Sequence, residues 1–530
     1  MRLVKIVLLF AAICGFSACE NNFDPKIYGV LGTENFPSTE KDYESLLMNC
    51  YIPFANVSWG YSFTSTQLGF YTPTGGVVRL LDGTSDLCAP WVIGTWGGAW
   101  LSLTSGQFED MALYGANAAD TSPGSFEKVR DVTRYTHIIG LLENATTIPE
   151  TVRDEFLGEA RFLRGMMMYY LLHYYGPVPV ILDPNLVGNI EAEANLVRPS
   201  LEWMVQSITD DLEYGVAHMS ETQTEKGRYT ADYARFCLMR HYLNEGKEHP
   251  DYYQKACELF TQFTGTYSLF KQGANPYLEQ FKSANAFNCE TIMAVICSTD
   301  DANGNMNGLS FYITPPDVAP YDDKGNPTPY ELHQGPWGHC LNIDPTFYST
   351  FESGDLRAKG ILTSYYSKDG HWVTAEDLGV KWNGFICSKF PVESKTFSQP
   401  APIPLARWAE VLLMYAEALT RRDNNVSQEA LNAINEVRER AGLAGTTRTS
   451  SVDEFLDAIL DERGHELYFE GGRKVDLIRF NKYYTKMKDA GRAPTSQYFP
   501  IPDYAIRQAE RNGKILEQYF TRDDYDGPKR

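Results

Sequence analysis

The stretch Glu462–Phe480, ERGHELYFEGGRKVDLIRF, contains two patterns that are typical of metal-binding helices. Glu462 and His465 have the Glu-x-x-His spacing of carboxylate-bridged di-iron bundles, and His465-Glu466 matches the first half of a zinc-protease helix. A di-iron site needs a second Glu-x-x-His pair, and none of the nine histidines supplies one. A zinc-protease helix needs a histidine at position 469, where Phe469 stands. The stretch therefore predicts no metal site.

The spacing of its acidic residues indicates a structural role instead. Three glutamates recur every four residues along one edge of the predicted helix: Glu462, Glu466 and Glu470. We expect this edge to form ion pairs with neighbouring arginines such as Arg438 or Arg440. Gly471 and Gly472 follow directly and permit either a break in the helix or close packing before VDLIRF.

The composition describes an acidic globular protein. A chain of 530 residues that is 43% hydrophobic can bury a substantial core, and its length allows more than one domain. The net charge of -21 and the absence of a long Lys/Arg run argue against nucleic acid as a partner, because phosphate binding needs a clustered basic surface.

The first nineteen residues predict export and lipidation. A short basic head, MRLVK, precedes an apolar stretch that is too short for a mature transmembrane helix, and Phe16-Ser17-Ala18-Cys19 matches a bacterial lipobox. We expect residues 1–18 to be a signal peptide, Cys19 to carry the acyl chains, and residues 19–40 to form a tether. Ordinary secretion is the alternative, because Phe16 replaces the commoner Leu.

The remaining cysteines show no framework. No close CxxC pair or regular spacing occurs, so neither zinc nor a disulfide scaffold is indicated, and buried free thiols are expected. The residues concerned are Cys50, Cys88, Cys237, Cys257, Cys289, Cys297, Cys340 and Cys387.

Helical periodicity dominates most of the chain outside two long insertions. Residues 52–106 and 285–400 are rich in turn-forming residues and hold most of the tryptophans, with one possible strand at Thr291–Cys297. Helices are predicted at 41–51, 126–145, 201–219, 230–246, 251–265, 407–422, 428–440 and 453–480. Another helix is predicted from Gly158 to the Gly176-Pro177 pair that ends it.

The helices show spacings of tetratricopeptide units. Trp408, Leu412 and Tyr415 follow the first part of that repeat, and Ala256 and Phe260 fit the close-packed face of a second helix. The intervening loops are longer than in a standard repeat. We therefore predict an all-α, tetratricopeptide-like helical scaffold with large irregular loop insertions and little β structure.

Several segments in order resemble one known family. GEARFLRGMMMYYLLHYYGPVPV, RWAEVLLMYAEAL, ALNAINEVRERAGL, the opening stretch and YFPIP follow a lipobox in the arrangement of the SusD/RagB-like outer-membrane lipoproteins of Bacteroidota. The resemblance implies four tetratricopeptide-like units, with an N-terminal region at 41–284 and a C-terminal region at 285–530 packed as one globular unit. It also implies a non-enzymatic protein, anchored by lipid at the cell surface, that captures nutrient as the lid of a SusC-like TonB-dependent transporter.

Glycan sites combine aromatic platforms with polar side chains that bond hydroxyl groups. The family places ligand-binding residues in the N-terminal loop region, where RLLDGTSDLCAPWVIGTWGGAW offers both kinds. The candidates there are Arg79, Asp82, Asp86, Trp91, Trp96 and Trp100. The alternative for each tryptophan is a plug beneath the loop.

Two further loops offer similar residues. In the segment from Ser298 to Cys340 the candidates are Asn303, Asn305, Tyr321 and Trp337, and a weaker set contains Tyr365, Trp372 and Trp382. Asp301, Asn303 and Asn305 resemble the start of a calcium loop, but Met306 and Tyr312 replace the Gly and Glu that an EF-hand requires. A looser structural calcium site stays open, and no other cofactor is expected.

The Trp-rich loops favour a polysaccharide or oligosaccharide ligand over the alternatives. Capture of oligopeptides would depend more on backbone hydrogen bonds than on stacked rings. A glycoside hydrolase would need two carboxylates across a cleft, which sequence spacing does not reveal. A structural repeat adaptor would need neither a lipobox nor Trp-rich insertions.

Overall fold

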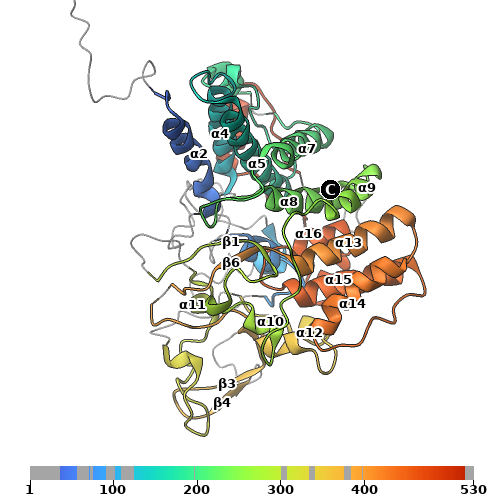
Figure 1. The fold of residues 1–530 in the computed structure, drawn as a ribbon. Coiled ribbons are helices and arrows are strands. Elements are labelled where there is room, and N and C mark those ends of the chain that lie inside the picture. The colour runs from blue at the N-terminus through green and yellow to red at the C-terminus, as the bar shows by residue number, and fades with distance from the viewer. Residues whose placement is uncertain are drawn as a thin grey trace, which may run out of the picture.

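The computed structural model describes residues 36–55, 71, 76–90, 102–108, 125–195, 197–299, 307–332, 341–374, 384–396 and 398–519. The predicted signal peptide and the lipidation site at Cys19 lie outside these residues. Within them the protein is mainly helical, as predicted, and Figure 1 shows the N-terminal helices at one end and the C-terminal helices beside them.

The N-terminal helices pack around one long central helix. The helix α5 runs from Glu150 to Tyr175 and contacts three other long helices. It ends where predicted, because Gly176 has a positive φ of 71° and Pro177 follows. The neighbouring helices are α2 (Glu40–Ala55), α4 (Val129–Glu143) and α7 (Leu201–His218), with the short elements η4 (Ser125–Lys128), η5 (Pro184–Leu186) and α6 (Ile190–Glu193).

The contact between α5 and α7 requires a small residue. A Cβ atom added to Gly215 of α7 would lie 2.8 Å from the Cβ of Phe162 on α5, so only glycine permits this approach. Hydroxyl caps start several of the helices, and at the start of α7 Ser200 accepts a hydrogen bond from the Trp203 amide. Thr230, Ser427 and Ser451 cap three later helices in the same way.

The next helices form the predicted tetratricopeptide-like pairs. The helices α8 (Ala231–Glu245) and α9 (Asp251–Phe260) pack together, as do α13 (Trp408–Asp423) and α14 (Gln428–Arg440). Phe260 of α9 stacks on Tyr415 of α13 with ring centroids 3.7 Å apart, and Trp408 lies 5.5 Å from the same ring. The two predicted stripes therefore meet across the α9–α13 contact.

The stretch from Asp453 to Phe480 is divided into two helices. The helix α15 runs from Val452 to Leu467 and α16 from Arg473 to Arg479. Phe469 and Gly471 both have positive φ, 60° and 84°, so the chain turns between the helices. The single helix predicted over 453–480 is therefore two helices, and the break that the Gly-Gly pair permits starts a few residues earlier.

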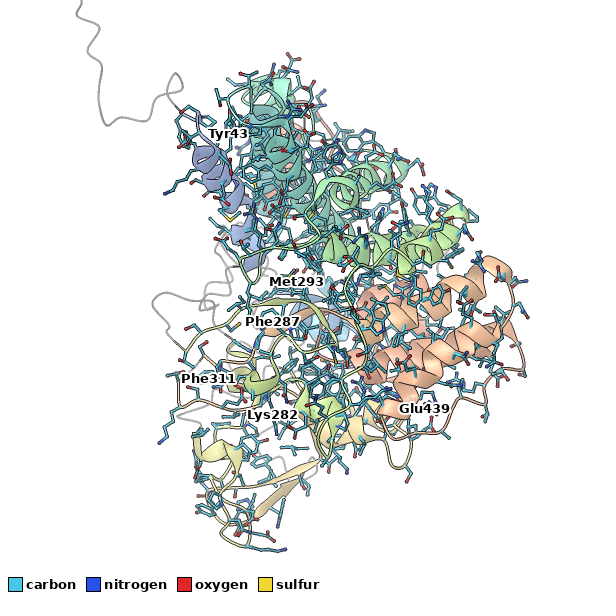
Figure 2. All side chains as sticks on the ribbon, in the orientation of Figure 1. Tyr43, Lys282, Phe287, Met293, Phe311 and Glu439 are labelled. Carbon is cyan, nitrogen blue, oxygen red and sulfur yellow. The ribbon has the colours of Figure 1, made fainter. Side chains whose placement is uncertain are left out.

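The few strands form three two-stranded antiparallel sheets. The strand β1 (Thr291–Val295), predicted from the sequence, pairs with β6 (Ile403–Arg407). Figure 2 labels Met293 of β1 at mid-height, between Tyr43 above and Lys282 below. The other pairs are β2 (Ile361–Leu362) with β5 (Ile386–Cys387) and β3 (Ser364–Tyr366) with β4 (Trp372–Thr374).

Short helical elements complete the described part. They are η1 (Val78–Asp82), α10 (Pro276–Glu279), η6 (Ser283–Asn285), α11 (Leu309–Ile313), η7 (Pro329–Leu332), α12 (Pro345–Tyr348), η8 (Leu356–Gly360), α17 (Tyr483–Asp489) and α18 (Asp503–Arg511).

The core consists of one large cluster and one satellite. The large cluster extends from Tyr43 on α2 to Leu516 near the C-terminus and so includes both halves of the chain. The satellite lies beneath the short strands and includes Tyr277, Tyr365 and Tyr468. The seven described cysteines after Cys19 are free thiols, as predicted, and only Cys289 among them is exposed.

Candidate functional site

The glutamates of the opening stretch form the centre of a buried charge network. Glu462 accepts hydrogen bonds from Arg357 at 2.5 Å and from Arg438 at 3.0 Å. Glu466 accepts from Arg407 at 2.9 Å and also pairs with Arg440. The predicted ion pairs with Arg438 and Arg440 are thus confirmed. We call the network of these three glutamates and their cationic partners the charged centre: Glu462, Glu466, Glu470, Arg357, Lys389, Arg407, Arg438 and Arg440.

The third glutamate joins the same network from the turn after α15. Glu470 accepts hydrogen bonds from Arg407 at 2.9 and 2.6 Å and from Lys389 at 2.5 Å. Burial alone raises the pKa of Glu466, but the charges of Arg440, Arg407 and Arg357 outweigh it and lower that pKa to about 2. The carboxylate of Glu466 therefore stays ionised and is unsuited to donate a proton at neutral pH.

His465 is a packed side chain in this structure. Its Nε2 atom lies 2.8 Å from the Thr350 hydroxyl, and its ring lies 4.2 Å from that of Phe351. Burial, followed by the nearby charge of Arg357, lowers its pKa well below the usual value and keeps it neutral. Among the described residues, no group of three or more His, Cys, Asp or Glu side chains is arranged to hold a metal ion.

Two of the predicted ligand residues attach the N-terminal loop to α16. The Asp82 carboxylate accepts hydrogen bonds from the backbone amides of Gly471 at 2.8 Å and Arg473 at 2.9 Å. The Asp86 carboxylate accepts two hydrogen bonds from the Arg473 guanidinium, both at 2.9 Å. Burial raises the pKa of Asp82 to about 7, against the lowering effect of the two amides.

The structure therefore gives this group an architectural role in place of the predicted ligand contacts. Asp82 and Arg79 are fully buried and Asp86 is nearly so. The two carboxylates bind protein partners almost 400 residues later in the sequence, where a sugar does not reach them. The sequence did not show this because the partners are Gly471, in the turn before α16, and Arg473, at its first residue.

Two other predicted residues belong to an exposed aromatic group. Tyr321 is 41% exposed and Trp372 is 49% exposed, and the partly exposed ring of Tyr366 lies between them. Ring centroids are 6.5 Å apart for Tyr321 and Tyr366 and 5.7 Å apart for Tyr366 and Trp372. We call Tyr321, Tyr366 and Trp372 the aromatic surface. It lies at the end of the molecule that carries β3 and β4, away from α4 and α7 (Figure 1).

Strand alternation explains why Tyr366 belongs to this surface and Tyr365 does not. Tyr366 is the cross-strand partner of Trp372, whereas Tyr365 faces Val373 on the opposite side of the β3–β4 pair. Tyr365 is buried in the satellite core. The prediction that Tyr365 belongs to the candidate set is therefore corrected to Tyr366, and a strand of three residues gives no periodicity in the sequence that separates the two.

Hydrogen bonds fasten the Tyr321 loop to the hairpin. The backbone amide of Ala319 donates to the Tyr366 carbonyl at 2.8 Å, and that of Lys368 donates to the Asp317 carbonyl at 2.8 Å. The Tyr365 hydroxyl donates to the Asp317 carboxylate at 2.7 Å. The aromatic surface is thus positioned by backbone and buried side-chain contacts before any ligand arrives, which lowers the entropy lost on binding.

The remaining predicted ligand residues lie outside the described residues. They are Trp91, Trp96, Trp100, Asn303, Asn305 and Trp337, together with Trp382 of the weaker set and Asp301 of the possible calcium loop. Of the predicted ligand residues that the structure describes, Tyr321 and Trp372 belong to one exposed surface.

Comparisons with known sequences agree with the resemblance. A sequence profile described as the SusD family matches residues 342–520, and one described as starch-binding associating with outer membrane matches residues 130–243. The chain is 27% identical to the starch-binding protein SusD of Bacteroides thetaiotaomicron, over 70% of this chain and 74% of that protein. It is also 27% identical to a SusD-like protein of Bacteroides ovatus, over 66% of this chain and 64% of that protein, which is slightly less than two thirds of its length.

Solved structures share the fold. A SusD superfamily protein from Parabacteroides distasonis has a TM-score of 0.69 at 19% identity, over 91% of this chain and 98% of that chain. A laminarin binding SusD-like protein has a TM-score of 0.68 at 19% identity, over 91% of this chain and 99% of that chain.

Proposed function

Because the chain belongs to the SusD family, we propose that it is a lipid-anchored protein of the outer-membrane surface that binds an oligosaccharide or polysaccharide nutrient. In this proposal it acts as the lid of a SusC-like TonB-dependent transporter and releases the glycan into it. The names of similar proteins support a glycan ligand, since one is a starch-binding protein and another binds laminarin. The transporter partner rests on the family resemblance.

The aromatic surface is the observation that carries this proposal. Sugar rings present weakly apolar faces that stack on Tyr and Trp side chains, and their hydroxyl groups need polar neighbours. Trp372 and Tyr321 expose large ring areas that soluble proteins ordinarily bury. Their separation is fixed through Tyr366 and the hydrogen bonds of the Tyr321 loop.

We also propose that the protein binds and transfers its ligand without a chemical step. A glycosidase needs a carboxylic acid whose pKa is raised so that it can donate a proton to the leaving group. Glu466, at the centre of the conspicuous acidic stretch, has a pKa of about 2 instead. Asp82 has a raised pKa, but it is fully buried and bound to two backbone amides.

The leader sequence and the family support the proposed location. The lipobox supports attachment through Cys19, after cleavage of residues 1–18, and a matching profile is described as associating with the outer membrane. In the part of the chain that the structure describes, no helix is long and apolar enough to cross a membrane.

Isothermal titration of residues 20–530 against neutral and anionic oligosaccharides and mixed tryptic peptides tests the proposed ligand. We expect a saccharide to bind and Trp372→Ala to weaken it by about tenfold or more, because stacked aromatic residues dominate such contacts. Trp203→Ala is the matched control, since Trp203 on α7 is also 42% exposed but lies outside the aromatic surface. Trp96→Ala and Trp337→Ala test the predicted residues outside the described part.

The same titration separates the alternatives. Binding of peptides with no response to saccharides would favour an oligopeptide importer. Slow cleavage of a bound saccharide, followed by chromatography of the mixture, would contradict the proposed absence of a chemical step.

A further inference from the structure

We propose that the aromatic surface selects a neutral glycan and discriminates against glycans that carry carboxylate or sulfate groups. This inference rests on the proposed function, because it names the class of glycan that the same surface takes. It is carried by the charged side chains of the two segments that bear the rings, residues 316–328 and 364–374.

Carboxylates outnumber cations in these segments. The four carboxylates belong to Asp317, Asp322, Asp323 and Asp369, and the two ammonium groups belong to Lys324 and Lys368. Neither segment contains an arginine. Arginine is the side chain that binds carboxylate and sulfate groups through two parallel hydrogen bonds, so the usual recognition element for an anionic sugar is missing from these two segments.

Part of this charge is fixed by the fold. The Asp322 carboxylate accepts hydrogen bonds from the amides of Lys324 and Asn326 and from the Asn326 side chain, at 2.8 to 2.9 Å. The hydrogen bonds from Asn326 are the main reason that the pKa of Asp322 lies below its usual value, so the group stays ionised. Of the two cations, the Lys368 ammonium donates a hydrogen bond to the Pro316 carbonyl at 2.8 Å, so one of its three donors is already used.

The carboxylates lie close enough to act on a bound sugar. Asp323 is two residues from Tyr321, so their Cα atoms are at most about 7 Å apart, and Asp369 is three residues from both Tyr366 and Trp372, at most about 11 Å. These distances are similar to the Debye length of about 8–10 Å at physiological salt, so salt screens the carboxylates only in part. The net charge of -21 adds a long-range repulsion that slows the approach of any polyanion.

A matched pair of polysaccharides tests the inference. Residues 20–530 are run in affinity gels that contain a panel of neutral polysaccharides, and each one retained is compared with its own sulfated derivative at low and high salt. We expect the neutral polymer to be retained in a manner that depends on Trp372. The sulfated derivative should bind about tenfold more weakly at low salt, and the difference should shrink at about 1 M salt, where the Debye length is about 3 Å.

A charge variant locates the effect. The double variant Asp323→Asn, Asp369→Asn should regain several-fold of the affinity for the sulfated polymer at low salt while its affinity for the neutral polymer changes little. The control Glu225→Gln, Glu510→Gln removes two exposed carboxylates from other parts of the surface and keeps the same net charge as the double variant. An equal gain in affinity for the sulfated polymer in the double variant and in its control would show that the local carboxylates do not select the ligand. That result would overturn the inference.

The inference and the proposed function fail in different ways. Equal or tighter Trp372-dependent retention of the sulfated polymer, or of a uronic acid polymer such as polygalacturonate, would overturn the selectivity and leave the glycan-binding function intact. Retention of no polysaccharide in a Trp372-dependent manner would overturn both.

Discussion

The charged centre and the aromatic surface both concentrate side chains that bind ligands in other proteins, yet they differ in what already occupies those side chains. In the charged centre each of the three glutamates contacts arginine or lysine. Glu466 contacts three arginines, which are Arg357, Arg407 and Arg440. On the aromatic surface, Tyr321 and Trp372 leave about half of their area to solvent. Reactive or ligand-binding side chains in a sequence therefore indicate a binding site only where the fold leaves them without protein partners and open to solvent.

The largest expected effect comes from removing the centre of the buried network. Glu466→Ala leaves Arg407 and Arg440 buried with one carboxylate fewer, and removing one partner of a buried ion pair costs about 3–5 kcal/mol. The free energy of unfolding from urea denaturation measures this loss. Glu225→Ala, an exposed control, should change it by less than about 0.5 kcal/mol.

A small change in the free energy of unfolding in Glu466→Ala would contradict the structural role given to the charged centre. A loss below about 1 kcal/mol would show that the charged centre contributes little to stability. Its carboxylates would then need another explanation.

A second variant sharpens the comparison because it concerns a buried amine that contacts no carboxylate among the described residues. Lys474 is fully buried on α16, and its Nζ atom lies 4.4 Å from the ring centroids of both Phe108 and Phe499. Burial lowers its pKa well below the usual value. We expect Lys474→Met to raise the free energy of unfolding by about 1–3 kcal/mol at neutral pH, since the apolar side chain removes the desolvation cost.

The pH dependence gives this prediction a sign. Because the folded-state pKa of Lys474 is depressed, the unfolded chain binds more protons between that pKa and the ordinary value of 10.5. The wild type therefore loses stability as the pH falls from about 10.5 toward the folded-state pKa. The advantage of Lys474→Met, measured by urea denaturation at a series of pH values, should be largest near neutral pH and shrink toward pH 10. A constant or reversed difference would contradict the account.

The smallest expected effect tests how the aromatic surface is positioned. Tyr365→Phe removes the hydrogen bond to Asp317 and should cost about 1 kcal/mol of stability. It should also weaken binding of a long oligosaccharide by about threefold, because the Tyr321 loop and the hairpin lose part of their common orientation. A monosaccharide that contacts one ring should bind with unchanged affinity, and titration calorimetry measures both.

The control for this variant removes a similar hydrogen bond elsewhere. The Tyr415 hydroxyl donates to Glu429 at 2.6 Å in the helical scaffold, so Tyr415→Phe should lower stability without changing either affinity. Equal weakening of long and short ligands by Tyr365→Phe would indicate a general structural effect.

The sequence predicted the features of the fold that depend on residues close together in the chain. Period 3.6 identified the helices, Gly176-Pro177 identified the end of α5, and the four-residue spacing of the glutamates identified an edge that pairs with Arg438 and Arg440. Each of these signals lies within one element or between adjacent helices.

The sequence did not predict the roles of side chains whose partners lie far away in the chain. Asp82 and Asp86 have the composition of a ligand loop, but their partners on α16 lie almost 400 residues later in the chain. The choice between Tyr365 and Tyr366 depended on which face of a three-residue strand meets the core, and so short a strand carries little periodicity.

The most direct test of the account is a crystal structure of residues 20–530 with a bound neutral oligosaccharide identified by the titration. We predict a sugar ring in van der Waals contact with the Trp372 indole, within about 4 Å, and unchanged ion pairs around Glu466. A sugar bound only at other side chains, with Trp372 still exposed, would contradict the assignment of the aromatic surface as the binding site.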